Sequence, residues 1–106
     1  PQPVTPQPVV AEPKYSFTEL DDAQKYDAEK LWNWIVQKRK LGRLPGGFGY
    51  KEMTDKCREI MERYPGSEYD FYARRTLGDI PERYWKMYNI TEEERDLTRF
   101  EVQSNP

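Results

Sequence analysis

The stretch KCREIMERYPGSEYDFYARRTLGDI, residues 56–80, decides the fold of this chain. Apolar side chains recur at helical spacing from Met53 to Tyr64, with charged residues between them. Pro65-Gly66 then breaks the helix, and Ser67 is suited to cap the next one. That helix has its own apolar stripe, which consists of Tyr69, Tyr72, Ala73 and Leu77. The stretch therefore predicts two amphipathic helices, over residues 51–64 and 67–78, joined by a tight turn.

A longer helix is predicted before this pair. Ser16 and Glu19 have the spacing of a capping box, and Gly42 supplies a stop after a basic last turn. Between them, apolar side chains lie on one stripe at helical spacing. The stripe consists of Leu20, Ala23, Ala28, Leu31, Trp34 and Ile35. We expect one helix of about 24 residues that begins near Ser16.

Two shorter helices are predicted after residue 80. Pro81 suits the first turn of a helix that Asn89 can end, and Thr91 with Glu94 offers a capping box for a helix to about Phe100. Residues 42–50 contain four glycines and a proline, which indicates a loop. The predicted fold class is all-α: a small bundle of about five helices in residues 16–100, with a Pro-rich extended arm in residues 1–15 and a flexible tail in residues 101–106.

The arm repeats the sequence Pro-Gln-Pro-Val and is expected to be polyproline-like. It serves either as a semi-rigid spacer or as a docking peptide, in which case Pro3, Pro6 and Pro8 contact the partner. The first residue is Pro1 and not Met. Export after removal of a signal peptide is one expectation from that start, and trimming of the chain is the other.

The turn at Tyr64-Pro65-Gly66-Ser67, followed by Tyr69, Ala73, Arg74 and Leu77, resembles the helix–turn–helix junction of tetratricopeptide-like repeats. The likeness is nearest to the repeats of bacterial outer-membrane assembly lipoproteins and other periplasmic repeat proteins. It covers about 40 residues, or at most about one and a half repeats. The longer loop at residues 42–50 and the bulky Met53 and Ile60 depart from the pattern. The resemblance implies a helical core that binds other proteins.

The side chains for the commonest enzyme chemistry are missing from the sequence. It has no histidine, and its one cysteine, Cys57, lies on an apolar stripe. The glycine-rich residues 44–49 lack the Gly-Lys-Ser/Thr ending of a phosphate-binding loop. We therefore expect no catalytic residue, no cofactor, no metal site and no small-molecule substrate, and the predicted class is not an enzyme.

The basic residues at the end of the first predicted helix allow a second reading. Lys38, Arg39, Lys40 and Arg43 could contact phosphates, with neighbouring aromatic rings stacking on bases. Cations are favoured at any helix C-terminus, however, and the net charge of the chain is −2. A single-stranded nucleic-acid-binding module is therefore the alternative, and no nucleic acid is the expected partner.

Four apolar side chains lie off the predicted stripes and are candidate contacts. They are Trp32, Val36, Phe71 and Trp85. Loops of a small domain can cover such rings, or the rings can form a contact surface, since Trp and Tyr dominate binding hot spots. The sequence thus predicts a non-catalytic protein–protein interaction module, an adaptor or assembly factor docked on a larger complex. No apolar run is long enough for membrane insertion.

Overall fold

The computed structural model describes residues 14–42 and 49–102. Its helices are α1 (Asp22–Gly42), α2 (Tyr50–Arg63), α3 (Glu68–Asp79), α4 (Arg83–Met87) and α5 (Glu92–Arg95), followed by the short 3-10 helix η1 (Thr98–Phe100). Those ranges hold no strand, and their only β contact is an isolated antiparallel bridge between Tyr15 and Glu101. The all-α bundle of about five helices is confirmed. Of the predicted arm and tail, residues 1–13 and 103–106 lie outside the described residues.

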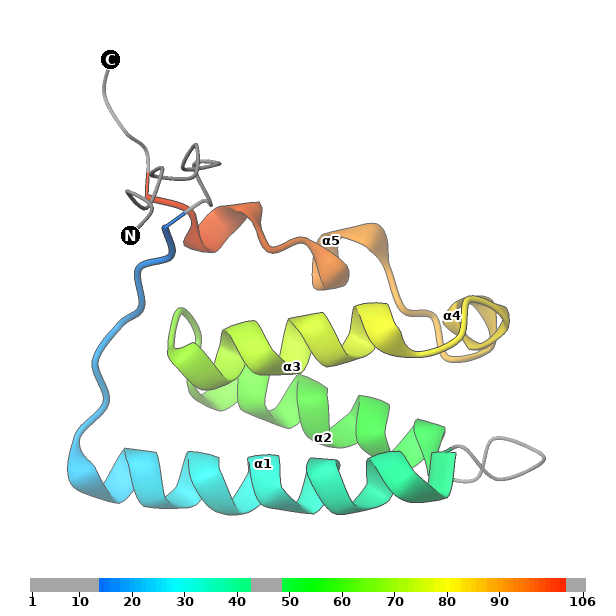
Figure 1. The fold of residues 1–106 in the computed structure, drawn as a ribbon, viewed down its shortest axis with the longest axis horizontal. Helices are drawn as coiled ribbons and strands as arrows, with labels where there is room; N and C mark the ends of the chain where they lie inside the picture. The colour runs from blue at the N-terminus through cyan, green and yellow to red at the C-terminus, as the bar shows by residue number, and fades with distance from the viewer. Residues whose placement is uncertain (1–13, 43–48, 103–106) are drawn as a thin grey trace, which may run out of the picture.

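The three long helices form the body of the molecule, with α2 packed between α1 and α3 (Figure 1). Met53, Cys57 and Ile60 on α2 are buried, as their spacing predicts. They meet Ile35 from α1 and Leu77 from α3 in one core cluster. Full burial of an aliphatic side chain of this kind contributes roughly 1.5–3 kcal/mol to the stability of the fold. None of the helices in the described ranges is long and apolar enough to cross a lipid bilayer.

The turn between α2 and α3 has the predicted form. Ser67 caps α3, where its Oγ accepts a hydrogen bond from the amide of Asp70 at 3.2 Å. Gly66 has a φ of +81°, and a Cβ at this position would lie 2.8 Å from Oγ1 of Thr18. The carbonyl of Gly66 also accepts a hydrogen bond from the amide of Thr18 at 2.8 Å. Both the backbone conformation and the close approach of residue 18 therefore require glycine here.

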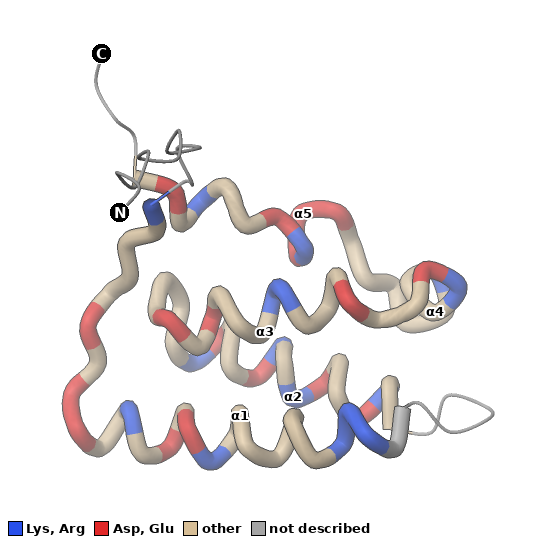
Figure 2. Tube along the Cα trace, viewed as in Figure 1, with Lys and Arg blue, Asp and Glu red and all other residues tan. Residues whose placement is uncertain are grey.

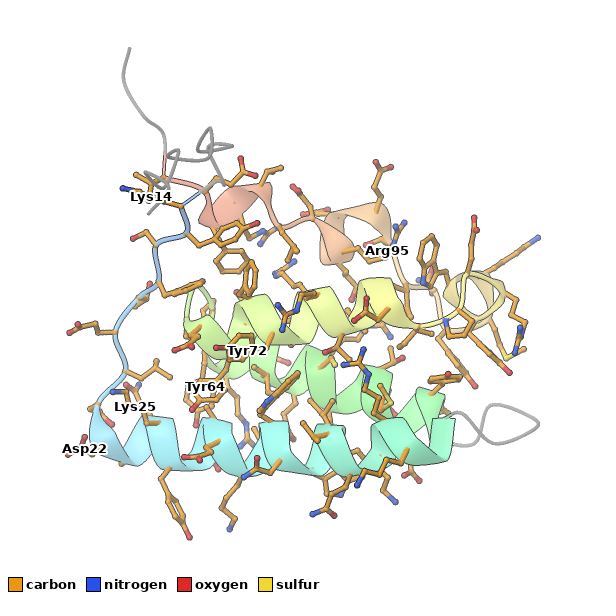
Figure 3. The ribbon with its side chains drawn as sticks, viewed as in Figure 1. Lys14, Asp22, Lys25, Tyr64, Tyr72 and Arg95 are labelled. Carbon is orange, nitrogen blue, oxygen red and sulfur yellow. The ribbon has the colours of Figure 1, made fainter. Side chains whose placement is uncertain are left out.

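The predicted start of the first helix is wrong by six residues. Helix α1 begins at Asp22, where Asp21 and Gln24 form the reciprocal cap: the amide of Gln24 donates to Oδ1 of Asp21 at 2.7 Å, and the amide of Asp21 donates to Oε1 of Gln24 at 3.0 Å. Residues 14–20 instead run as an extended strap along the end of α3 (Figure 1). The strap is held by Ser16, whose amide donates to the carbonyl of Phe100 at 2.8 Å. Lys14 and the helix start at Asp22 mark its two ends in Figure 3.

The last predicted helix is also shorter than expected. The capping box of Thr91 and Glu94 is present, but α5 ends at Arg95. The carboxylate of Asp96 accepts hydrogen bonds from the amide and hydroxyl of Thr98, at 2.9 and 2.8 Å, which favours a turn over helix continuation. Arg58 of α2 anchors this region through a 2.7 Å ion pair with Glu94.

Cys57 packs in the core, and burial raises the pKa of its thiol to about 12. Because the thiolate is the reactive form, at pH 8 the folded protein should react with a thiol-specific disulfide reagent more than about 100-fold more slowly than the denaturant-unfolded chain. The release of the chromophore from such a reagent measures both rates. Equal rates in the two states would mean that Cys57 is accessible.

Candidate functional site

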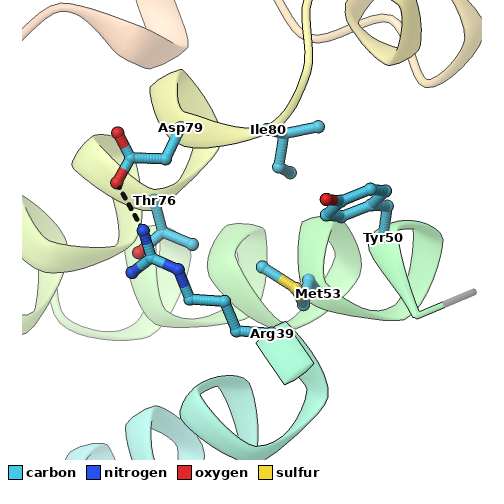
Figure 4. A pocket seen from close by; sticks show the side chains of 6 residues that line it. All are labelled: Arg39, Tyr50, Met53, Thr76, Asp79 and Ile80. Carbon is cyan, nitrogen blue, oxygen red and sulfur yellow. Dashed lines mark hydrogen bonds and ion pairs between the residues drawn. The ribbon is translucent and has the colours of Figure 1, made fainter. Parts of the chain in front are cut away.

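A small pocket opens where the ends of three helices meet (Figure 4). It has a volume of about 110 Å³. Its lining residues are Arg39, Tyr50, Met53, Thr76, Asp79 and Ile80. Met53, Thr76 and Ile80 are buried and form its inner wall, while Arg39 and Asp79 are half-exposed. The pocket therefore combines a fixed inner wall with two charged groups that solvent can reach.

The charged groups form an ion pair between two helix ends. Arg39 lies in the last turn of α1, where the helix dipole favours a cation, and Asp79 is the last residue of α3. Nη2 of Arg39 donates to Oδ2 of Asp79 at 2.8 Å. Thr76 has no free donor, because its hydroxyl donates to the carbonyl of Tyr72 at 2.8 Å, and its oxygen remains only as an acceptor. The charged groups that a ligand in the pocket would meet are therefore the guanidinium and the carboxylate, beside the hydroxyl groups of Tyr50 and Thr76.

The pocket lies at the basic end of α1, which Figure 2 shows as a blue segment. Lys38 is 3.5 Å from Glu52, and its ammonium lies 5.1 Å from the centroid of the Trp34 ring. Lys56 approaches the same ring at 5.5 Å, so Trp34 is a half-buried ring between two lysines. Its predicted place in the core stripe is therefore only partly correct. Lys40 is exposed and makes no ion pair with any residue of the described ranges. Arg43 lies outside those ranges.

The four predicted contact residues differ in their exposure to solvent. Val36 is exposed, whereas Trp32 is half-buried with its ring centroid 5.3 Å from that of Tyr72. The ring of Trp85 is covered by the guanidinium of Arg95, which lies 3.7 Å from its centroid. The role of these side chains as protein contacts stays a prediction, and Pro3, Pro6 and Pro8 lie outside the described residues.

Of the four candidate contacts, Phe71 is the one that the structure buries, so for this ring the alternative of covering by other segments holds. Phe71 points away from the stripe that packs on α2, as expected, but it is only 6% exposed. The strap and η1 cover it, with the ring centroids of Tyr15, Phe17 and Phe100 at 4.6, 5.5 and 5.5 Å from its own. Helix α3 is therefore buried on two faces, which its own sequence cannot show.

Sequence reasoning missed the pocket. It treated Arg39 only as part of a basic run and gave no role to Asp79, which lies 40 positions away along the chain. No local pattern marks this pair, because it forms only when α1 and α3 pack against α2. Among the described residues, no three histidine, cysteine or acidic side chains lie close enough together to hold a metal ion.

Comparison with known proteins connects the chain to an enzyme. It is 26% identical over 76 residues to a probable nicotinate-nucleotide adenylyltransferase of Gloeobacter violaceus. The match covers 72% of this chain and 36% of that protein, so the chain spans about a third of the relative's length. No family model matches the chain, and no solved structure matches it. The resemblance to tetratricopeptide-like repeats therefore stays a prediction, as do the predicted partners.

This match contradicts the prediction of a non-catalytic module, in both its protein-binding and its nucleic-acid-binding forms, and the prediction that the chain is not an enzyme. The prediction excluded catalysis because the sequence has no histidine and its one cysteine is buried. Neither observation excludes an enzyme. Transfer of phosphoryl-type groups depends on positioning and on neutralising charge, and needs little covalent chemistry from the protein. A sequence rich in lysine and arginine can therefore serve it without a nucleophilic side chain.

Proposed function

We propose that this chain is the helical part of an enzyme that acts on nucleotides, in the class that transfers an adenylyl group from ATP to a mononucleotide. The observation that carries the proposal is the 76-residue match to a probable nicotinate-nucleotide adenylyltransferase. The match covers only 36% of that relative, so the rest of the relative has no counterpart in the match. The proposed activity is therefore that of a whole protein, to which this chain contributes the helical part.

The basic end of α1 offers the charge that such a reaction uses. Adenylyl transfer moves negative charge onto a leaving pyrophosphate, which cationic side chains stabilise. Arg39 is neutralised by Asp79, and Lys38 lies near Glu52, whereas Lys40 has no acidic partner in the described ranges. Lys40 is therefore the cation of this group that is best placed to meet a phosphate.

The test is an assay of pyrophosphate release by the whole protein that contains this helical part, with magnesium ATP and nicotinate mononucleotide as substrates. We expect turnover, and we expect Lys40→Ala to raise the KM for ATP roughly 5- to 10-fold, equivalent to about 1 kcal/mol of lost binding. Lys25→Ala is the matched control, because Lys25 is an exposed lysine at the other end of α1 (Figure 3). Its KM should stay within about twofold of the unmodified protein, since an exposed charge remote from the phosphates contributes little. Absence of pyrophosphate release with this pair of substrates would contradict the proposal.

A further inference from the structure

The ion pair at the pocket leaves hydrogen-bonding capacity on both partners. Arg39 has five N–H donors, and one of them is used by Asp79. Neither side chain makes a second hydrogen bond or ion pair to a residue within 14–42 or 49–102. A ligand that enters the pocket can therefore bond to the guanidinium and to the carboxylate at once.

The charges select against an ionic ligand. Arg39 and Asp79 together carry no net charge, so an anionic ligand would place two carboxylates on one guanidinium, and the two anions would repel each other. A cationic ligand would meet Arg39 with the same penalty. A neutral group that presents one acceptor beside one N–H donor suits both partners: the acceptor faces Arg39 and the donor faces Asp79.

The size and walls of the pocket favour a single aromatic ring. Its volume of about 110 Å³ is below the roughly 150 Å³ of an engineered cavity that holds benzene, but the pocket is not closed, because Arg39 and Asp79 in its lining are half-exposed. The thioether of Met53 and the side chains of Tyr50 and Ile80 provide apolar contact. One six-membered ring fits with its polar edge at the opening, whereas a fused ring with its sugar would remain outside.

We propose that this pocket binds a neutral six-membered aromatic ring that carries an acceptor next to an N–H donor, as a pyridine carboxamide or an aminopyrimidine base does. The inference goes beyond the proposed function, because ATP has a fused base and nicotinate mononucleotide has a carboxylate, and neither presents such a neutral single ring. The preference for an uncharged ligand over a charged one rests on the Arg39–Asp79 ion pair alone. It also differs from what the relative's name suggests, since nicotinate is a carboxylate at neutral pH.

Nuclear magnetic resonance titration of the full chain with nicotinamide, cytosine and nicotinate at pH 7 tests the proposal. The amides of Tyr50, Thr76 and Ile80 should shift with at least one neutral ligand, with a Kd of about 1 mM, as expected for fewer than about ten ligand atoms. Nicotinate should bind at least about 10-fold more weakly, the effect of one carboxylate facing another across a shared guanidinium. If nicotinamide binds more tightly than cytosine, the natural ligand is a pyridine carboxamide. If cytosine binds more tightly, the natural ligand is an aminopyrimidine base.

Asp79→Asn is the decisive variant, because it removes the opposing carboxylate and leaves an exposed amide in its place. The ratio of the nicotinate Kd to the nicotinamide Kd should fall about 10-fold or more. Asp55→Asn is the matched control, since Asp55 is an exposed carboxylate of α2 that pairs with Lys51 outside the pocket. That variant should keep the original ratio.

Three results would overturn the inference: no shift at the pocket amides with any neutral ligand, nicotinate binding as tightly as nicotinamide, or an unchanged ratio in Asp79→Asn. The titration contains no ATP and requires no turnover. Binding of a neutral ring without adenylyl transfer would therefore contradict the proposed function but support this inference. Adenylyl transfer without binding of a neutral ring would support the proposed function but contradict this inference.

Discussion

Replacement of Arg74 by alanine is expected to lower the free energy of unfolding by about 3–5 kcal/mol, the usual cost of breaking a buried ion pair from one side. Nε of Arg74 donates to Oδ1 of Asp70 at 2.9 Å, and Asp70 is only 1% exposed. Nη1 of Arg74 also donates to the carbonyls of Glu93 and Glu94, at 3.3 and 3.2 Å. The variant would leave a buried carboxylate without its cation and would free α5 from α3. Urea unfolding followed by circular dichroism measures the change.

Arg75→Ala is the matched control for this prediction. Arg75 is exposed and lies over the rings of Phe71 and Tyr72, in each case 5.5 Å from the ring centroid. Loss of such exposed cation–π contacts costs about 0.5–1 kcal/mol. The double variant Arg74→Met with Asp70→Asn should recover much of the loss, because it removes the buried charge and keeps the volume. A loss below about 1 kcal/mol in Arg74→Ala would mean that water reaches Asp70 and that the pair is not buried in solution.

The sequence predicted those parts of the fold that depend on neighbouring residues. The α2–α3 turn is confirmed because Ser67 caps α3 through a bond to Asp70, three positions away. The same reasoning failed at the start of α1, where two capping boxes compete. The sequence pattern favours Ser16 with Glu19, whereas the cap that forms is Asp21 with Gln24. With α1 beginning at Asp22, the half-buried ring of Phe17 packs against Phe71 of α3, a contact that a local pattern does not contain.

The candidate site could not be predicted, because its residues come from three helices that are far apart in the sequence. Tyr50 opens α2, Arg39 ends α1 and Asp79 ends α3, so the pocket exists only after the three helices pack. Each residue has an ordinary local explanation: Arg39 as a cation at a helix end, and Asp79 as a polar residue before a turn. The covering of Trp85 by Arg95 likewise depends on tertiary packing, here that of α5 on α3.

Replacement of Phe71 by alanine should lower the free energy of unfolding by about 3–5 kcal/mol, the range for emptying a buried aromatic site. Phe71 joins α3 to the strap and to η1 through its contacts with the rings of Tyr15, Phe17 and Phe100. The strap has few other attachments, among them the hydrogen bonds of Ser16 to Phe100 and of Thr18 to Gly66. Without the ring, residues 14–20 should detach from α3 before the helices unfold. Urea unfolding and amide hydrogen exchange at Ser16 and Thr18 measure the two effects.

Val36→Ala is the control, because Val36, like Phe71, lies off the apolar stripe of its helix, but is 42% exposed. Its effect should remain within about 0.5 kcal/mol, as for most surface substitutions. Phe71→Leu keeps most of the apolar volume and should cost less than Phe71→Ala, with the amide of Ser16 still protected. If Phe71→Ala is as mild as Val36→Ala and exchange at Ser16 and Thr18 does not change, the strap does not close over α3 in solution. That outer face of α3 would then be open to solvent.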